Sequence, residues 1–181
     1  PGPDGPPFDR RRSKPRRGPS PEARALNEEI KAARFADELL AIFHHADRAL
    51  FDYFRVSMLW SRLGRASRRP LRPADVHELI AHTIDTLPIS DARGVANILH
   101  GAAKARLRGR DAAALYEAGE AAARRVMHEM VPQALSNTAW AFATIGHASP
   151  KLFDAVAAAA VPRLGEFNPQ NIANTAWAFA S

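Results

Sequence analysis

The chain carries the stretch PQALSNTAWAFA at Pro132–Ala143 and returns to it as PQNIANTAWAFA at Pro169–Ala180. Both copies are rich in alanine, are apolar on nearly every side of a helix, and lack the alternating pattern of a β-strand. Their tryptophans, Trp140 and Trp177, lie 37 residues apart. A period of this length is typical of stacked helix pairs, because one pair cannot bury its apolar faces alone.

Weaker copies extend the pattern toward the N-terminus. Steps of 40 residues back from Trp140 lead to His100 and then to Trp60, each among small and aliphatic neighbours. An asparagine precedes the aromatic position by three residues in three copies, and Ser57 replaces it in the first. The expected structural anchors of the repeat are therefore Trp60, His100, Trp140, Trp177, Asn97, Asn137 and Asn174.

Local signals divide each copy into two helices. After the first helix, Gly146 suits a left-handed C-cap, and Ser149 suits the N-cap of the second helix. Pro162 is expected to kink or split that second helix. The last repeat is three residues shorter than the others, and the extra residues of the longer repeat are expected in its basic loop, residues 104–110. The sequence thus predicts an all-α chain, an α-solenoid of stacked antiparallel helix pairs with repeats of about 37–40 residues.

The N-terminal segment has a different composition. Residues 1–21 contain seven of the fourteen prolines, and residues 1–20 carry a net charge of +4 (six Lys and Arg against two Asp) out of +6 for the whole chain. We expect a disordered basic tail over 1–21 and a helical repeat domain over 22–181, with three to four repeats, the last incomplete. The tail is either a solvated linker or an arm that contacts phosphates. Because position 1 is not Met and an apolar pattern runs up to Ser181, we also expect a piece of a longer chain.

The sequence lacks the motifs of several kinds of catalytic and metal-binding site. The chain contains no Cys, so disulfides and thiol chemistry are excluded. No metal signature such as HExxH occurs, and the Ser, His and acidic residues form no catalytic constellation. We expect no catalytic residue, metal, cofactor or small-molecule substrate, and hence no enzyme. No apolar run approaches the ~18 residues of a membrane helix, which predicts a soluble protein without membrane contact.

The repeated phrase also carries a family resemblance. NPQNIANTAWAFA at residues 168–180 resembles the octotricopeptide-type repeats of algal and protist organelle proteins, and it is similar to the helical repeats that precede the RAP domain in the FAST-kinase-domain family. The resemblance covers two good copies over 111–181 and two degenerate ones over 50–110. It implies an α-solenoid that binds RNA in a chloroplast or mitochondrion and acts in RNA processing, stability or translation. The chain departs from the pattern at His100 and Ser57 and carries no RAP domain, so no nuclease role follows.

Two groups of residues are candidates for RNA contact. The polar residues near the start of the first helix differ from repeat to repeat: Arg93, Gln133, Gln170 and Asn171. Such variation is expected of positions that read bases, and it is equally expected of a solvent-exposed surface without a binding role. Basic residues between the helices suit phosphates, although charged loops are also often merely solvated: Arg65, Arg68, Arg69, Lys104, Arg106, Arg108 and Arg110. The two basic clusters follow successive first helices, which predicts one basic stripe along an edge.

Two interpretations of the repeated residues stay open. The asparagines either contact base edges or tie neighbouring helices together. The tryptophans are expected to pack in the core rather than to stack on bases. The predicted function is single-stranded-RNA binding. The alternative is a protein-interaction scaffold or a structural subunit of a larger assembly, which the net charge of only +2 outside the tail favours.

Overall fold

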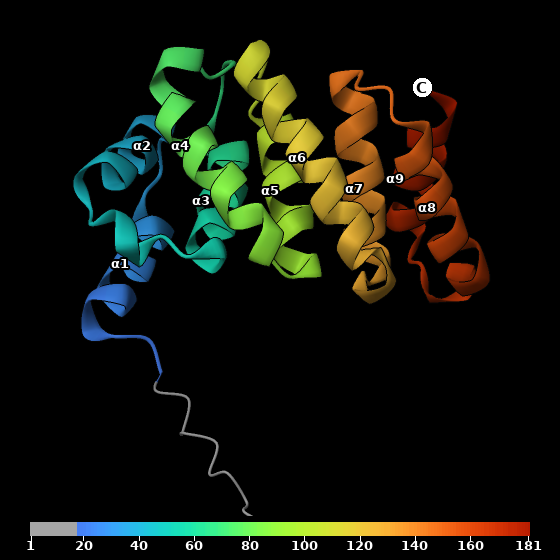
Figure 1. The fold of residues 1–181 in the computed structure, drawn as a ribbon, viewed down its shortest axis with the longest axis horizontal. Coiled ribbons are helices and arrows are strands. Elements are labelled where there is room, and N and C mark those ends of the chain that lie inside the picture. The colour runs from blue at the N-terminus through green and yellow to red at the C-terminus, as the bar shows by residue number, and fades with distance from the viewer. Residues whose placement is uncertain (1–17) are drawn as a thin grey trace, which may run out of the picture.

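The computed structural model describes residues 18–181 and is all-helical over that range (Figure 1). The predicted tail falls mostly on residues 1–17, which lie outside the described residues. The first helix begins at Pro21, where the Ser20 hydroxyl accepts a hydrogen bond from the backbone N–H of Ala23 and caps the helix. Within residues 18–181 the α-helices are α1 (Pro21–Ala32), α2 (Ala36–His45), α3 (Tyr53–Ala66), α4 (Pro73–Thr86), α5 (Ala92–Lys104), α6 (Arg110–Val126), α7 (Pro132–Ile145), α8 (Pro150–Ala160) and α9 (Pro169–Ala180).

The helices beyond α2 lie in two rows (Figure 1). Helices α3, α5, α7 and α9 pack side by side as the first row, and α4, α6 and α8 form the second. Neighbours in the first row are in closer contact than neighbours in the second. Helices α1 and α2 pack against α3 and α4 and cover the N-terminal end of both rows.

The tightest crossing joins α3 to α5. Gly101 of α5 lies directly against the backbone of α3, so that a Cβ atom there would overlap the carbonyl group of Trp60. Gly64 approaches from the other side, since its Cβ would lie 2.7 Å from the carbonyl oxygen of Gly101. Two glycines in register therefore set the separation of these helices.

Trp60 connects the two rows. Its side chain is fully buried, and its indole N–H donates a hydrogen bond of 2.8 Å to the hydroxyl of Thr83 in α4. That hydroxyl in turn donates to the carbonyl of Leu79, at 2.6 Å. The polar edge of the largest core side chain is thereby satisfied, as a buried indole requires.

The register of α3 differs from the expected step. The N-cap residues Asp52 and Asp91 are 39 residues apart, whereas the predicted step between Trp60 and His100 is 40. Counted from the N-cap, the residue of α3 that matches His100 is Ser61, and Met58 rather than Ser57 matches Asn97. Trp60 is therefore a core residue of α3 and not the equivalent of the later aromatic positions.

The structure confirms the predicted caps and the predicted helix break, but not the predicted position of the extra residues. Gly146 adopts a left-handed conformation (φ 68°), and the Ser149 hydroxyl caps α8, as predicted. Helix α8 ends at Ala160, and Pro162 lies in the 3-10 turn that follows, so the predicted break is confirmed. The position expected for the three extra residues is wrong. The N-caps of α5 and α6 are as far apart as those of α7 and α8, and the three extra residues come later, because α6 and its 3-10 turn span residues 110–129 whereas α8 and its 3-10 turn span residues 150–166.

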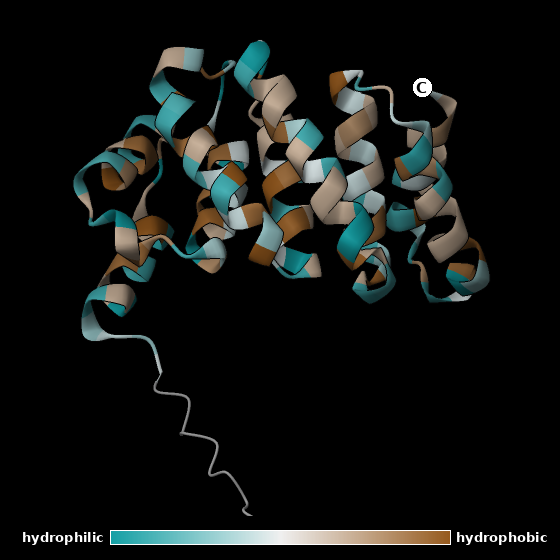
Figure 2. Cartoon of the chain, viewed as in Figure 1, coloured by the Kyte–Doolittle hydropathy of each residue, from teal (hydrophilic) through white to brown (hydrophobic). Residues whose placement is uncertain are grey.

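Hydropathy varies along every helix, with apolar and hydrophilic residues in each (Figure 2). No helix within residues 18–181 is at once long enough and apolar enough to cross a membrane.

Candidate nucleic-acid interface

One side of the first row is left uncovered by the rest of the chain. Counted from the N-cap, the second, sixth, ninth and thirteenth residues of each first-row helix are spaced by three or four, so they share one side of the helix. All of these side chains are partly or fully exposed. We call them the open face: Phe54, Met58, Ser61 and Arg65 of α3; Arg93, Asn97, His100 and Lys104 of α5; Gln133, Asn137, Trp140 and Thr144 of α7; Gln170, Asn174, Trp177 and Ser181 at α9.

The open face thus collects residues that the sequence singled out separately. The variable polar positions, the repeated asparagines and the aromatic positions form three parallel files across the helices. Phe54, Met58, Ser61 and Thr144 belong to the same face but were not among the predicted contacts. Counting from the N-cap residue Asp52 would have found the first three, because the N-caps and not the tryptophans carry the register.

A groove of about 720 Å³ runs along this face between α3, α5 and α7. Its walls include two arginines, two asparagines and a glutamine: Arg65, Arg93, Asn97, Asn137 and Gln133. Most ligand grooves present only a few polar groups among apolar ones. This groove offers amide and guanidinium groups from three successive helices, which suits a polar chain-like ligand.

The repeated asparagines have unused hydrogen-bonding capacity. Asn97, Asn137 and Asn174 are half-exposed, and their side-chain amides form no hydrogen bond with any other residue in the described part of the chain. The structure therefore does not support the interpretation that they tie helices together. Each primary amide presents two donor hydrogens and an acceptor oxygen, enough to pair with a base edge.

Asn171 does tie helices, and its prediction as an RNA contact is wrong. It is only 7% exposed, and its Nδ2 donates to the Ser136 hydroxyl of α7 at 3.2 Å. It also completes a reciprocal cap with Asn168 at the start of α9. The cause is its place in the helix: the third residue after the N-cap faces the neighbouring helix, and Ala134 is buried at the same place in α7.

The aromatic file forms a continuous ladder. The ring centroids of His100 and Trp140 are 5.1 Å apart, and those of Trp140 and Trp177 are 6.4 Å apart. Trp140 is half-buried and Trp177 is 48% exposed, so the expectation of core packing holds for Trp60 but not for Trp177. Burial lowers the pKa of His100 to about 4, with a smaller contribution from Lys104 and Arg65. The His100 ring is therefore neutral near pH 7 and suited to stacking.

The first-row helices carry no acidic residue at all. Of their basic residues, Arg55 is buried and pairs with Asp52 at 2.9 Å, and Arg62 donates to the carbonyls at the end of α1. The other three, Arg65, Arg93 and Lys104, lie on the open face. Two carboxylates flank the groove where α5 and α7 begin: Asp91, which caps α5, and Glu129.

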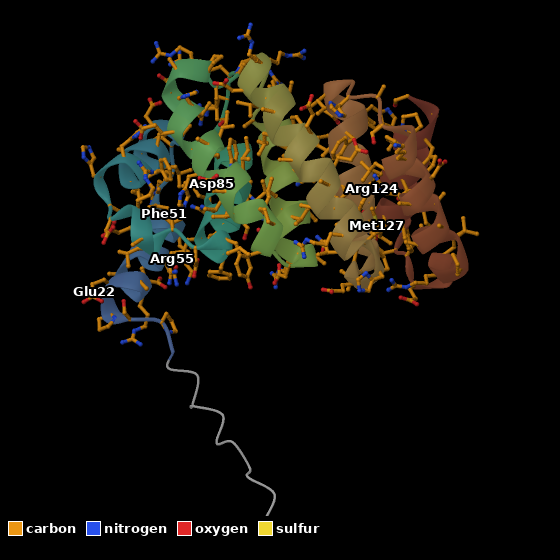
Figure 3. All side chains as sticks on the ribbon, in the orientation of Figure 1. Glu22, Phe51, Arg55, Asp85, Arg124 and Met127 are labelled. Atoms are coloured by element: carbon orange, nitrogen blue, oxygen red, sulfur yellow. The ribbon has the colours of Figure 1, made fainter. Side chains whose placement is uncertain are left out.

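Further arginines lie along the edge where the first-row helices end. The backbone N–H of Leu71 donates to the carbonyl of Ala105 at 3.4 Å, which joins the loop after α3 to the loop after α5. Figure 3 shows nitrogen-tipped side chains projecting from this edge, beside the starts of α4 and α6. Within residues 18–181, no carboxylate lies within ion-pair distance of these arginines, which we call the basic edge: Arg68, Arg69, Arg106, Arg108 and Arg110.

The structure therefore brings both predicted basic clusters together, with Arg65 and Lys104 where the basic edge meets the open face. Arg72, in the same loop, is instead paired with Asp75 at 2.7 Å. Over residues 18–181, no cluster of three His, Asp or Glu is arranged to hold a metal ion. No family model matches the chain, and no curated protein matches it either. The resemblance to octotricopeptide-type repeats thus stays a prediction.

Proposed function

We propose that this chain is an α-solenoid of stacked antiparallel helix pairs, of the octotricopeptide type, that binds single-stranded RNA along its open face. The observation that carries the proposal is the file of half-exposed asparagine amides without a protein partner, each beside an aromatic or polar position on the same helix. By the family resemblance, its place of action is a chloroplast or mitochondrion, in RNA processing, stability or translation.

The chemistry of the open face fits unpaired nucleotides better than a duplex. Bases of a single strand expose their Watson–Crick edges, which amides such as those of Asn137 and Gln133 can pair with. Exposed rings such as Trp177 accept a stacked base, a contact worth about 1–3 kcal/mol. Phosphates between the bases require positive charge, which Arg65 and Lys104 offer next to the basic edge.

The distribution of charge supports the same ligand. The chain outside residues 1–20 carries only +2, but the first-row helices hold five basic residues and no acidic one. Carboxylates within the second-row helices, such as Asp85 of α4 and Glu120 of α6, belong to the other row. An anionic strand along the open face therefore meets Arg65, Arg93 and Lys104, with the carboxylates of Asp91 and Glu129 only where α5 and α7 begin.

A protein-interaction scaffold is the second candidate. The observation in its favour is the apolar surface of α9, where Ile172 and Phe179 are 47% and 48% exposed. Clustered exposed apolar side chains are a feature of protein–protein contact sites.

Fluorescence anisotropy with labelled single-stranded RNA, at two salt concentrations, tests the proposal. Reversing the charge of Arg65 (Arg65→Glu) is expected to weaken binding and to reduce its salt dependence. Arg124→Glu is the matched control, because Arg124 is exposed on α6 in the second row (Figure 3). Equal losses in the two variants would contradict binding along the open face.

Deletion of residues 1–17 separates the body from the tail. If the shortened chain no longer binds RNA, the basic arm and not the open face is the RNA-binding element. If neither form binds, the scaffold becomes the better explanation.

A further inference from the structure

A second pocket, which meets the open face only at Thr144, lies where α5 ends, α6 begins and α7 ends. Its volume is about 250 Å³, below the roughly 300 Å³ at which pockets for drug-sized ligands begin. The pocket therefore suits a small group rather than a whole nucleotide. Four features of its lining matter here: Arg106 and Arg108, Gly109 at the start of α6, and Tyr116.

The hydroxyl of Tyr116 is an unpartnered buried polar group. The side chain is only 1% exposed, and its oxygen has no hydrogen-bond partner in the described part of the chain. Burial raises the pKa of Tyr116 well above its ordinary value, so the hydroxyl keeps its proton and remains a donor. Buried polar groups without a partner are rare, and each calls for an explanation such as an absent ligand.

The start of α6 supplies further free donors to this pocket. Its N-cap is Gly109, which has no side chain to cap the helix. The backbone N–H groups of Arg110, Asp111 and Ala112 have no hydrogen-bond partner within residues 18–181. Free N–H groups and the positive end of the helix dipole together favour an anion.

Arg106 occupies a backbone position that favours glycine. Its φ is +56°, and its N–H and the next one close the turn after α5 onto the carbonyls of Ala103 and Ala102. The same turn after α7 has Gly146 at this place, with a φ of +68°. An arginine held in the left-handed region is strained relative to glycine. Here it adds a guanidinium to the pocket wall.

The equivalent turn after α7 shows what the pocket loses when these features are absent. Tyr116 packs edge-on against Phe142 at 5.7 Å, and Phe153 packs in the same way against Phe179 at 5.1 Å, whereas the residue of α8 that matches Tyr116 counted from the N-cap is Val156, so neither Phe153 nor Val156 carries a hydroxyl there. Ser149 caps α8 with its own side chain, where Gly109 leaves α6 uncapped. The second turn is thus satisfied internally, and the first has donors left over.

We infer that the pocket formed by Arg106, Arg108, the start of α6 and Tyr116 binds a phosphate group. Two arginines offer charge-assisted hydrogen bonds, the free N–H groups of α6 face the anion, and the Tyr116 hydroxyl donates to one of its oxygens. The two nearby carboxylates each face a histidine, one of which, His147, also lines the pocket. Asp111 binds His77 of α4 at 2.8 Å, and Glu120 faces His147 at 3.8 Å.

The source of the phosphate is either an internal phosphodiester of an RNA strand or a terminal phosphate. The pocket lies beside Lys104 and Thr144, the last residues of the open face on α5 and α7, so a bound strand can reach it. Binding of phosphate itself does not depend on the RNA proposal.

Titration of the full ¹⁵N-labelled chain with inorganic phosphate, at constant ionic strength set by chloride, tests the pocket. We expect saturable shifts of the backbone amide signals of Arg110, Asp111 and Ala112. Tyr116→Phe and Arg106→Gly are each expected to weaken phosphate binding at least about ten-fold, since each removes a hydrogen bond to a charged group. Absence of shifts at these amides, or wild-type affinity in both variants, would overturn the inference.

Arg106→Gly uses the residue that the chain itself places in the equivalent turn after α7, and Tyr116→Phe keeps the buried ring, so neither is expected to lower the melting temperature. Arg106→Gly relieves a strained backbone, and Tyr116→Phe removes an orphaned hydroxyl. Tyr53→Phe and Arg124→Ala are the matched controls and are expected to bind phosphate as the wild type does. A loss of phosphate binding in the controls equal to that in the test variants would also overturn the inference.

Paired RNA oligonucleotides, with a 5′-phosphate or a 5′-hydroxyl, identify the source. A gain in affinity from the 5′-phosphate that Arg106→Gly abolishes supports a terminal phosphate. Equal affinities that Arg106→Gly weakens alike support an internal phosphodiester. If inorganic phosphate binds at α6 while no RNA binds, the pocket stands and the proposed function fails.

Discussion

Substituting Gly101 by alanine tests the packing of the first row most directly. A Cβ atom at this position would lie 2.5 Å from the carbonyl carbon of Trp60, 3.0 Å from the backbone nitrogen of Ser61, and closer still to the Trp60 carbonyl oxygen. All three are backbone atoms of α3, so no side chain can rotate away. The helices must separate, which opens the core around Trp60 and the adjoining wall of the open-face groove.

The expected loss of stability follows from two opposing effects. Overpacking of a close-packed core costs about 1–3 kcal/mol, and a rigid backbone contact belongs near the upper end of that range. Replacing glycine by alanine inside a helix returns about 1 kcal/mol. The net loss is therefore about 2 kcal/mol, which lowers the melting temperature of a chain of this size by roughly 4–8 °C.

Thermal unfolding followed by circular dichroism measures the change, with Gly165→Ala as the control. A Cβ at Gly165 would meet no atom within 4 Å, so that variant should melt at or slightly above the wild-type temperature. Comparison of the repeats alone would predict that alanine is tolerated at position 101, because the equivalent residues of α7 and α9 are Ala141 and Ala178. A Gly101→Ala variant as stable as the wild type would refute the close crossing of α3 and α5.

Three further predictions concern single side chains. Trp60→Phe is expected to lower the free energy of unfolding by about 1–3 kcal/mol in urea titrations, since it leaves a void and removes the hydrogen bond to Thr83. The pKa of His100 lies near 4 in the folded chain, below the ordinary value of 6.5, so the folded state resists protonation and its stability should fall as pH drops from about 6.5 toward 4. Urea titrations across this pH range should show a shallower fall in stability for His100→Gln than for the wild type. NMR titration should place the midpoint of His100 protonation near pH 4. Asn171→Ala should lower the free energy of unfolding by about 1 kcal/mol and leave RNA affinity unchanged. Asn174→Ala should weaken RNA binding and leave stability unchanged. The reverse pattern, with stability measured by melting and affinity by anisotropy, would contradict the assignment of the two residues.

Features with a local physical cause could be predicted from the sequence. The helical class follows from alanine-rich apolar periodicity, and the turn after α7 follows from Gly146, which relieves the left-handed conformation, and Ser149, which caps the next helix. The break at Pro162 follows from a missing backbone donor. Each of these depends on a few adjacent residues and on no partner elsewhere in the chain.

The register of α3 could not be predicted by matching tryptophans. A slip of one residue rotates a side chain by about 100° around a helix, which moves Trp60 from the open face to the core. The two positions look alike in sequence because both sit among small apolar residues. They differ in tertiary environment: Thr83 in α4 provides the hydrogen bond that accommodates an indole at the buried position.

The net charge of residues 21–181 describes neither row of helices by itself. A sum over residues 21–181 of +2 averages two rows of helices whose composition differs, and it weighs a carboxylate on α4 equally with one on α5. Within a low-dielectric wall and a screening length of about 8 Å, an anionic ligand on the open face interacts mainly with the charges of the first row. Those helices hold Arg65, Arg93 and Lys104 at their uncovered side and no acidic residue. Assigning each helix to its row is therefore the step that separates these charges, and the carboxylates nearest the groove, Asp91 and Glu129, lie where α5 and α7 begin.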